Sequence, residues 1–366
     1  MKQILLLFTV LVSSVLHAQT TGYKINIDVK GLPEKCEVFL KDFETTTEIN
    51  KGVLVGGKGT LQGQMENAPR LLFLTLYTGS ETYWCNFMID AEEVTIQAAT
   101  KDFPFHVKVQ GSAVQDVFSK LNTELADNRT LRDSLFAYAK TIMTNADKKA
   151  ELKRLVREMA VIDSMEIVTK KEFVESNLQS YPAVLELFLV RSSYEKAEVA
   201  ALFLQLSETL KQSAYGVKLK NYLGIEKIVA KGDKAFAFSA QDKDGNIHPF
   251  PEANGKYVLL DFTKDYCAPC VASVKELKEI STKYKDRLAV VSFSPDEKQG
   301  WLKGLQRDQP SWLNLWDGKG TAGPVILNYG VQAYPTFLLI DPSGTVVAKS
   351  VGYSAGSLQT MLKSFL

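Results

Sequence analysis

The chain has 366 residues, a hydrophobic content of 45% and a formal net charge of +1. A chain of this length is expected to form two or three domains, and its apolar content is typical of folded globular domains. Basic and acidic residues nearly balance, at 43 and 42, so the composition gives no sign of a nucleic-acid partner or of a strongly charged one.

Residues 1–18 have the three parts of a secretory signal peptide. A positive start at Lys2 is followed by an apolar run from Ile4 to Leu16 and by a small residue, Ala18, at the expected cleavage site. The run is shorter than the ~20 residues that span a membrane, and no cysteine follows it to carry a lipid anchor. We therefore expect cleavage, with an uncleaved anchor as the alternative. The mature protein is expected in the periplasm or cell envelope, soluble or loosely membrane-associated.

Residues 19–111 are predicted to form an all-β, sandwich-like domain. The segment Tyr23–Val29 alternates polar and apolar residues, which is the period of a half-buried strand. Further short strand-like runs, separated by Gly and Asn, are typical of a sandwich or small barrel. These runs are Glu37–Leu40, Gly59–Gly63, Leu71–Tyr77 and Val94–Ile96. No catalytic constellation occurs here, so we expect partner binding, substrate binding or packing.

Cys36 and Cys85 fall on predicted strands of this domain. Each could be a buried small hydrophobe, or the two could form the structural disulfide that an exported setting permits. Neither has a sequence context that lowers a thiol pKa, so a redox relay to other cysteines is not favoured.

Residues 112–228 are predicted to be helical. Apolar residues recur at the i, i+3, i+4, i+7 spacing of an amphipathic helix. The first such set is Val114, Val117, Phe118 and Leu121. Mixed charges between the apolar positions are typical of a solvated face. This region could space the two ends of the chain or form a homodimer.

The most specific chemical feature is the pair Cys267 and Cys270. The pair follows a predicted buried strand, Tyr257–Phe262, and precedes a predicted helix, Val271–Ile280. Cys267 is therefore expected at a helix N-terminus, where free backbone N–H groups and the helix dipole favour a thiolate. A thiolate attacks disulfides, and a second cysteine one turn away can close on the first and release the attacked group.

Two structural alternatives exist for a C-x-x-C pair. A zinc site needs further ligands, but the remaining candidates, Cys36, Cys85, His106 and His248, are not closely spaced, so we predict no metal. An inert disulfide is the second alternative in an exported protein. Neither histidine has a partner in the sequence, so both are expected to be structural or on the surface.

The segment Val258–Cys270 resembles the active-site segment of the thioredoxin superfamily. A later stretch, Tyr329–Gly344, resembles the family's second hallmark, a proline that opens an apolar strand. The resemblance implies that the Tyr334–Pro335 bond is cis, that Pro335 faces the cysteines, and that the backbone beside Tyr334 accepts a substrate chain. A proline that merely starts a strand is the alternative, since few X–Pro bonds are cis.

Asp261 lies six residues before Cys267, at the position of the family's buried acid. The resemblance implies that it takes and returns a proton as Cys270 reacts. Burial would raise the pKa of this carboxyl toward neutrality, which suits that role. The alternative is an acid at the end of an exposed strand.

Further stretches, most of them between these two hallmark segments, resemble one branch of the superfamily, the exported TlpA/ResA-like thiol-disulfide oxidoreductases. The matching stretches are Phe293–Asp296, Trp301 with Leu302, Gly323–Val331, and a strand with an Asp-Gly turn in Phe236–Asn246. The fold expected for residues 229–366 is therefore an α/β thioredoxin-like fold. Residues 19–111 resemble the small β domain, of unassigned role, that precedes this domain in Bacteroidetes relatives.

The chain departs from the family pattern at four positions. The family commonly has Trp before the first cysteine, where this chain has Tyr266, and often a second Trp where it has Thr263. Many relatives have Glu at the position of Ser273, and thioredoxin has its helix-kinking proline at that of Lys275. These changes leave the cysteine pair intact but bear on its potential and its substrate range.

The sequence thus predicts an exported thiol-disulfide oxidoreductase of the protein-disulfide reductase type, without a bound cofactor. Reduced Cys267 attacks a substrate disulfide, and Cys270, deprotonated with help from Asp261, resolves the mixed disulfide. The residues expected to contact substrate are Tyr266, Ala268, Pro269, Tyr334 and Pro335. The expected partners are disulfide-containing exported proteins and a membrane thiol donor, because no nicotinamide or flavin motif is present.

Three other functions stay open at this point. The same chemistry could run in reverse, as a disulfide oxidase or isomerase. A peroxide-reducing enzyme of the related peroxiredoxin group is disfavoured by the Cys-Ala-Pro-Cys pair. The third is a non-catalytic, redox-sensitive binding protein of the cell envelope.

Overall fold

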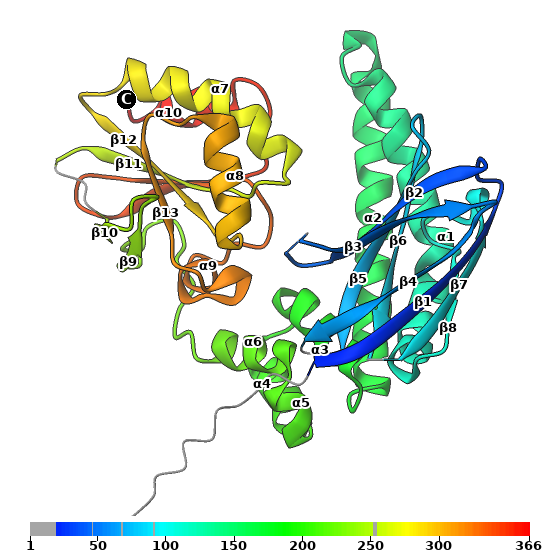
Figure 1. Cartoon of the computed structure of the whole chain (residues 1–366). Helices are drawn as coiled ribbons and strands as arrows, with labels where there is room; N and C mark the ends of the chain where they lie inside the picture. Colours follow the sequence, from blue (N-terminus) through cyan, green and yellow to red (C-terminus); the bar gives the residue numbers. More distant parts are fainter. Residues whose placement is uncertain (1–19, 46, 67–68, 91, 252–254) are drawn as a thin grey trace, which may run out of the picture. The chain divides into compact units, whose positions relative to one another are not determined.

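The computed structural model describes residues 20–366 except 46, 67–68, 91 and 252–254 (Figure 1). The predicted signal peptide, residues 1–18, lies outside the described residues. Contacts divide the chain into two compact units. One unit comprises the chain up to Leu40 together with Asn50–Ser119, and the other comprises Lys41–Ile49 together with Lys120–Leu366. The predicted domain boundaries, after residues 111 and 228, stay a prediction.

The predicted N-terminal β domain is confirmed, and its strands belong to one eight-stranded sheet. The strands are β1 (Thr20–Lys30), β2 (Lys35–Asp42), β3 (Glu48–Val55), β4 (Lys58–Glu66), β5 (Arg70–Tyr77), β6 (Thr82–Ile89), β7 (Glu93–Ala99) and β8 (Lys108–Gln110). Their order is β6-β5-β2-β3-β4-β1-β7-β8, with β1 antiparallel to β4 and parallel to β7. In β2 every second residue is buried, as expected for a sheet with one face toward a core.

Cys36 on β2 and Cys85 on β6 are free and buried, so a disulfide between them, one of the two alternatives above, is wrong. Burial raises the pKa of the Cys85 thiol to about 12 and also raises that of Cys36. Both side chains are therefore protonated at neutral pH and behave as small apolar groups.

The predicted helical region is also confirmed. Its α-helices are α1 (Ala113–Ile142), α2 (Lys149–Ser176), α3 (Tyr181–Val190), α4 (Lys196–Gln205), α5 (Glu208–Gln212) and α6 (Ala214–Leu223). Phe118 and Leu121, from the apolar set that predicts α1, are buried. Ion pairs such as Arg129–Glu166, 2.9 Å apart, join α1 to α2. Among the described residues, no helix is long and apolar enough to cross a membrane.

The C-terminal part has the predicted α/β architecture, with a seven-stranded sheet in the order β10-β9-β13-β12-β11-β14-β15. Its strands are β9 (Phe238–Gln241), β10 (Ile247–Phe250), β11 (Tyr257–Phe262), β12 (Leu288–Ser294), β13 (Leu313–Trp316), β14 (Thr336–Ile340) and β15 (Val346–Val351). Its α-helices are α7 (Ala268–Lys283), α8 (Lys298–Asp308), α9 (Pro324–Asn328) and α10 (Ser357–Leu362). The strand β11 is parallel to β12 and antiparallel to β14.

Alternate residues of β11 face opposite sides of this sheet. Leu259 packs with apolar residues of α7 and α10, whereas Val258 and Leu260 belong to a second apolar cluster. The alternation places Asp261 on the face of Leu259, which is the face that α7 covers. The sheet therefore positions the acid beneath the helix that begins at the cysteine pair.

The predicted apolar stripe of α7 is partly wrong, because Val271 is 38% exposed. Each step of three residues falls about 60° short of a full helical turn, so the first and the last residue of such a repeat cannot both face the core. The residues buried on α7 are instead Cys270, Ser273, Glu276, Leu277 and Ile280. Glu276 is tolerated there because its carboxylate accepts the backbone N–H groups of Gly356 and Gln359 at the start of α10.

Candidate active site

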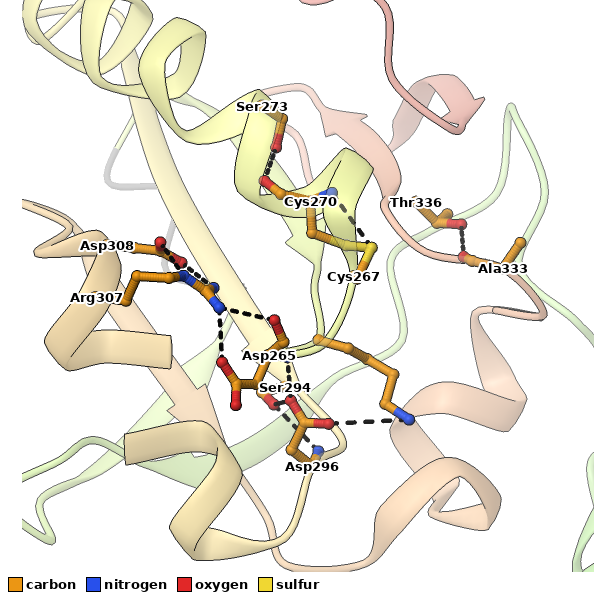
Figure 2. Close-up of a disulfide and its surroundings, with 11 residues drawn as sticks. Asp265, Cys267, Cys270, Ser273, Ser294, Asp296, Arg307, Asp308, Ala333 and Thr336 are labelled. Carbon is orange, nitrogen blue, oxygen red and sulfur yellow. Dashed lines mark hydrogen bonds and ion pairs between the residues drawn. A yellow bond between two sulfur atoms is a disulfide. The ribbon is translucent and has the colours of Figure 1, made fainter. Parts of the chain in front are cut away.

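The strand β11 ends at Phe262, and the chain reaches α7 through a short loop whose last residue is Cys267. The Sγ atom of Cys267 accepts a hydrogen bond of 3.2 Å from the backbone N–H of Cys270. The two cysteines are disulfide-bonded, with Cα atoms 5.2 Å apart (Figure 2). The predicted position of Cys267 at a helix N-terminus is thus confirmed.

The two cysteines differ in exposure. Cys267 is half-buried, whereas Cys270 is only 2% exposed. A substrate can therefore approach the sulfur of Cys267 and not that of Cys270. This asymmetry suits an attacking thiol at Cys267 and a resolving thiol at Cys270.

Ser273 shows how the helix accommodates one departure from the family pattern. Its side chain is 1% exposed, and its hydroxyl donates a hydrogen bond of 2.7 Å to the backbone oxygen of Cys270. A carboxylate at this buried position would lose its hydration, whereas a small hydroxyl finds its partner within the same turn.

Asp261 is 3% exposed, so the alternative of an exposed acid is wrong. One carboxylate oxygen, Oδ2, accepts a hydrogen bond of 2.8 Å from the Ser292 hydroxyl, which itself accepts one of 2.9 Å from Trp312 Nε1. The other oxygen, Oδ1, has no hydrogen-bond partner among the described residues. Burial raises the pKa of Asp261 to about 7, and the Ser292 hydrogen bond opposes that rise. The carboxyl can therefore both accept and give a proton near neutral pH.

A cavity of about 40 Å³ adjoins Asp261. Its lining includes Ser292, Trp312, Asp308 and, on α7, Val274. A cavity needs only ~10–15 Å³ by this measure to hold a water molecule, so there is room for more than one. The buried carboxyl of Asp261 therefore lines a space that water can enter.

The Tyr334–Pro335 peptide bond is cis, as the resemblance implied. Pro335 is buried and directly precedes β14. The next residue, Thr336, lies opposite Phe262 in the sheet, so the cis bond stands beside the point where the chain leaves β11 for the cysteines. The hydroxyl of Thr336 donates a hydrogen bond of 2.7 Å to the backbone oxygen of Ala333, which closes this loop (Figure 2).

Three of the residues predicted to contact substrate surround the half-buried Cys267 at the surface. Tyr266 is 63% exposed, and Ala268 and Pro269 are exposed as well. Tyr334 differs, because its hydroxyl is buried without a hydrogen-bond partner among the described residues, and burial raises its pKa. The hydroxyl of Tyr334 is therefore not available to a substrate. The substrate-binding roles stay predictions.

Ser292 and Trp312 were not predicted as site residues. Ser292 is paired with Asp261 across β12 and β11, and Trp312 lies just before β13. Neither position has a local motif, so only the strand register reveals them. Among the described residues, no cluster of three or more His, Cys, Asp or Glu side chains could hold a metal.

Two segments of the chain match the models of known families. Residues 254–346 match the Thioredoxin-like family, and residues 23–118 match a Domain of unknown function (DUF4369). The thiol-disulfide oxidoreductase ResA of Bacillus cereus is 30% identical over 122 residues, which are 33% of this chain and 69% of that protein. The thioredoxin-like protein YneN of Bacillus subtilis is 30% identical over 142 residues, which are 38% of this chain and 79% of that protein.

Among solved structures, a thiol-disulfide oxidoreductase from Bacteroides fragilis is 26% identical, with a TM-score of 0.34, and the match covers 37% of this chain and 100% of that one. The ResA and YneN matches each cover more than two thirds of the relative at 30% identity. The chain therefore belongs to the thioredoxin-like family of ResA-type thiol-disulfide oxidoreductases.

Proposed function

We propose that the protein is exported and reduces disulfides of cell-envelope proteins by dithiol exchange. The observation that carries the proposal is the pair of unequal cysteines at the start of α7, one half-buried and one buried. In the reduced protein, the backbone N–H of Cys270 and the positive end of the α7 dipole would stabilise a thiolate on Cys267.

The reaction follows from this arrangement in two steps. The Cys267 thiolate attacks one sulfur of the substrate disulfide, so that the S–S bond breaks, a mixed disulfide forms and the other substrate sulfur leaves as a thiolate. Cys270 then loses its proton, which Asp261 accepts, and the Cys270 sulfur attacks that of Cys267. The second substrate thiolate leaves, two electrons have passed to the substrate, and the protein holds the Cys267–Cys270 disulfide.

A separate thiol donor must reduce this disulfide again. The chain contains no nicotinamide or flavin motif, so a membrane-bound dithiol is the proposed donor. The signal-peptide features of residues 1–18 support export, and export places the protein where disulfides persist. The β domain and the helical region have no part in this reaction, and the roles proposed for them are partner binding, substrate binding, packing or homodimer formation.

Substrate trapping tests the proposal in cells. With Cys270 replaced by alanine, the second step is blocked, so we expect mixed disulfides between Cys267 and envelope proteins to accumulate. They would be caught by acid quenching and alkylation and identified by mass spectrometry after release with a reductant. The matched control, Cys267→Ala with Cys270→Ala, should give none. Adducts confined to cytoplasmic proteins would refute export, and the absence of adducts would favour a non-catalytic binding protein.

A further inference from the structure

The loop that leads into Cys267 is anchored at Asp265, whose exposed fraction is 8%. Arg307, at the end of α8, donates from Nη1 to the backbone oxygen of Asp265 at 2.8 Å and to its carboxylate Oδ1 at 2.7 Å. The backbone N–H of Asp265 donates to Oδ2 of Asp296 at 2.8 Å. Both backbone polar groups and the side chain of one loop residue are therefore held (Figure 2).

Arg307 is itself oriented by a second carboxylate. Its Nε and Nη2 atoms each donate a hydrogen bond of 2.7 Å to Asp308, one to each carboxylate oxygen (Figure 2). The guanidinium thus uses one edge on Asp308 and its remaining nitrogen on Asp265. A planar fork with five N–H donors can do this, whereas the compact ammonium of lysine cannot.

Asp296 is fixed just beyond the end of β12. Its Oδ2 accepts a second hydrogen bond, of 2.9 Å, from the Ser294 hydroxyl, and its backbone oxygen accepts one of 2.7 Å from Trp316 Nε1. Its Oδ1 pairs with Lys264 Nζ at 3.9 Å. The anchor of the loop is therefore a carboxylate with a defined position.

These contacts place two carboxylates close to the attacking sulfur. Two residues span at most about 7 Å between Cα atoms, so with the side chains and the Asp265–Asp296 hydrogen bond added, both carboxylates lie within roughly 14 Å of the Cys267 sulfur. The screening length is ~8–10 Å at moderate salt, but the side chains of Asp265 and Asp296 are only 7% and 10% exposed, and buried charges are screened much less than exposed ones, so both charges act on Cys267. Each carboxylate alone disfavours a thiolate at Cys267, and the cations of Arg307 and Lys264 oppose them.

We propose that Arg307 is a positioning residue for the redox reaction, fixing the loop before Cys267 and offsetting the Asp265 carboxylate. Asp296 anchors the same loop but adds a negative charge. The two residues therefore act alike on the position of the loop and in opposite directions on the reactivity of Cys267. The inference rests on the proposed role of Cys267 as the attacking thiol.

The pH dependence of Cys267 alkylation in the reduced full-length protein tests this inference. Arg307→Gln removes the cation, so the alkylation rate at pH 7 should fall by about threefold and its midpoint should move to higher pH. Asp296→Asn keeps an oxygen acceptor for the loop but removes a negative charge. Its rate should rise by a similar factor, about threefold, with the midpoint at lower pH. Arg307→Lys keeps the positive charge but lacks the forked guanidinium, so its alkylation rate should lie between those of the wild type and Arg307→Gln.

A matched control is Arg287→Gln, because Arg287 donates to the backbone oxygen of Leu366 and takes no part in this network. Its alkylation profile should equal that of the wild type. If Arg307 and Asp296 acted only by holding the loop in place, Arg307→Gln and Asp296→Asn would shift the alkylation profile in the same direction. That result would overturn the inference, and so would profiles of both variants that equal the wild-type profile. Alkylation needs no disulfide substrate, so its outcome is distinguishable from a failure of the proposed function.

Discussion

Replacing Cys267 with alanine is expected to abolish disulfide reduction by the purified protein. Cys267 is half-buried and its sulfur accepts the Cys270 N–H at the start of α7, whereas the other three cysteines are buried, so Cys267 is the thiol that begins the reaction. Cys270→Ala should complete only the first step and stop as a mixed disulfide. The measurement mixes reduced protein with a substrate that carries one disulfide and counts the thiols released.

The control for this experiment is Cys36→Ala. Cys36 is buried and its thiol pKa is raised, so its loss should change the rate by less than about twofold. A Cys267→Ala protein that still reduced the substrate at the wild-type rate would show that the chemistry lies elsewhere in the chain.

Replacing Asp261 with asparagine is expected to stabilise the protein at alkaline pH. Burial raises the pKa of Asp261 from 3.8 to about 7. Because the folded-state pKa lies above the unfolded value, the contribution of the Asp261 carboxyl to the free energy of unfolding is fully present below about pH 4 and is lost as pH rises through 7. The difference of about three pKa units corresponds to a loss of about 4 kcal/mol of unfolding free energy by pH 8.

Asparagine keeps an oxygen for the Ser292 hydroxyl but does not ionise. The Asp261→Asn protein should therefore be the more stable one at pH 8, by up to about 4 kcal/mol, and lack this loss between pH 4 and 8. Urea unfolding of the oxidised protein, followed by tryptophan fluorescence, measures it. Three of the four tryptophans lie in the C-terminal domain. A variant with the wild-type pH dependence would refute the assignment of a buried, titrating carboxyl.

The same substitution should slow the reaction. Without a proton acceptor, Cys270 resolves the mixed disulfide through solvent alone, so the second step at pH 7 should slow by about 10²-fold. Greater stability together with lower activity is the pattern expected where a charged group is held for function. This combination separates a catalytic role for Asp261 from a purely structural one.

The features that could be predicted from the sequence are those that depend on residues close together in the chain. The Cys267–Cys270 pair is such a feature, whereas the cis bond before Pro335 and the burial of Asp261 were implied by the resemblance to the thioredoxin superfamily. The residues of α7 that face the core could not be predicted as well, because Val271 fits an apolar repeat of three residues and a helix does not keep such a repeat on one face. Spacing alone could not show which side of the helix meets the sheet.

The partners of the site residues could not be predicted, because tertiary contacts place them. Ser292 meets Asp261 through the register of β12 on β11, 31 residues away in sequence. Arg307 reaches Asp265 from the end of α8, across 42 residues. In the sequence, Arg307 is one of many surface charges, and only the packing of α8 shows what it holds.

The redox equilibrium of the Cys267–Cys270 pair with glutathione tests the central claim most directly. A net reductase requires a potential near or below about −250 mV, and this is the value that we predict for the purified mature protein. A potential of roughly −120 to −180 mV would contradict the proposed direction and indicate an oxidase or isomerase. No reversible two-electron exchange at all would contradict the enzymatic account itself.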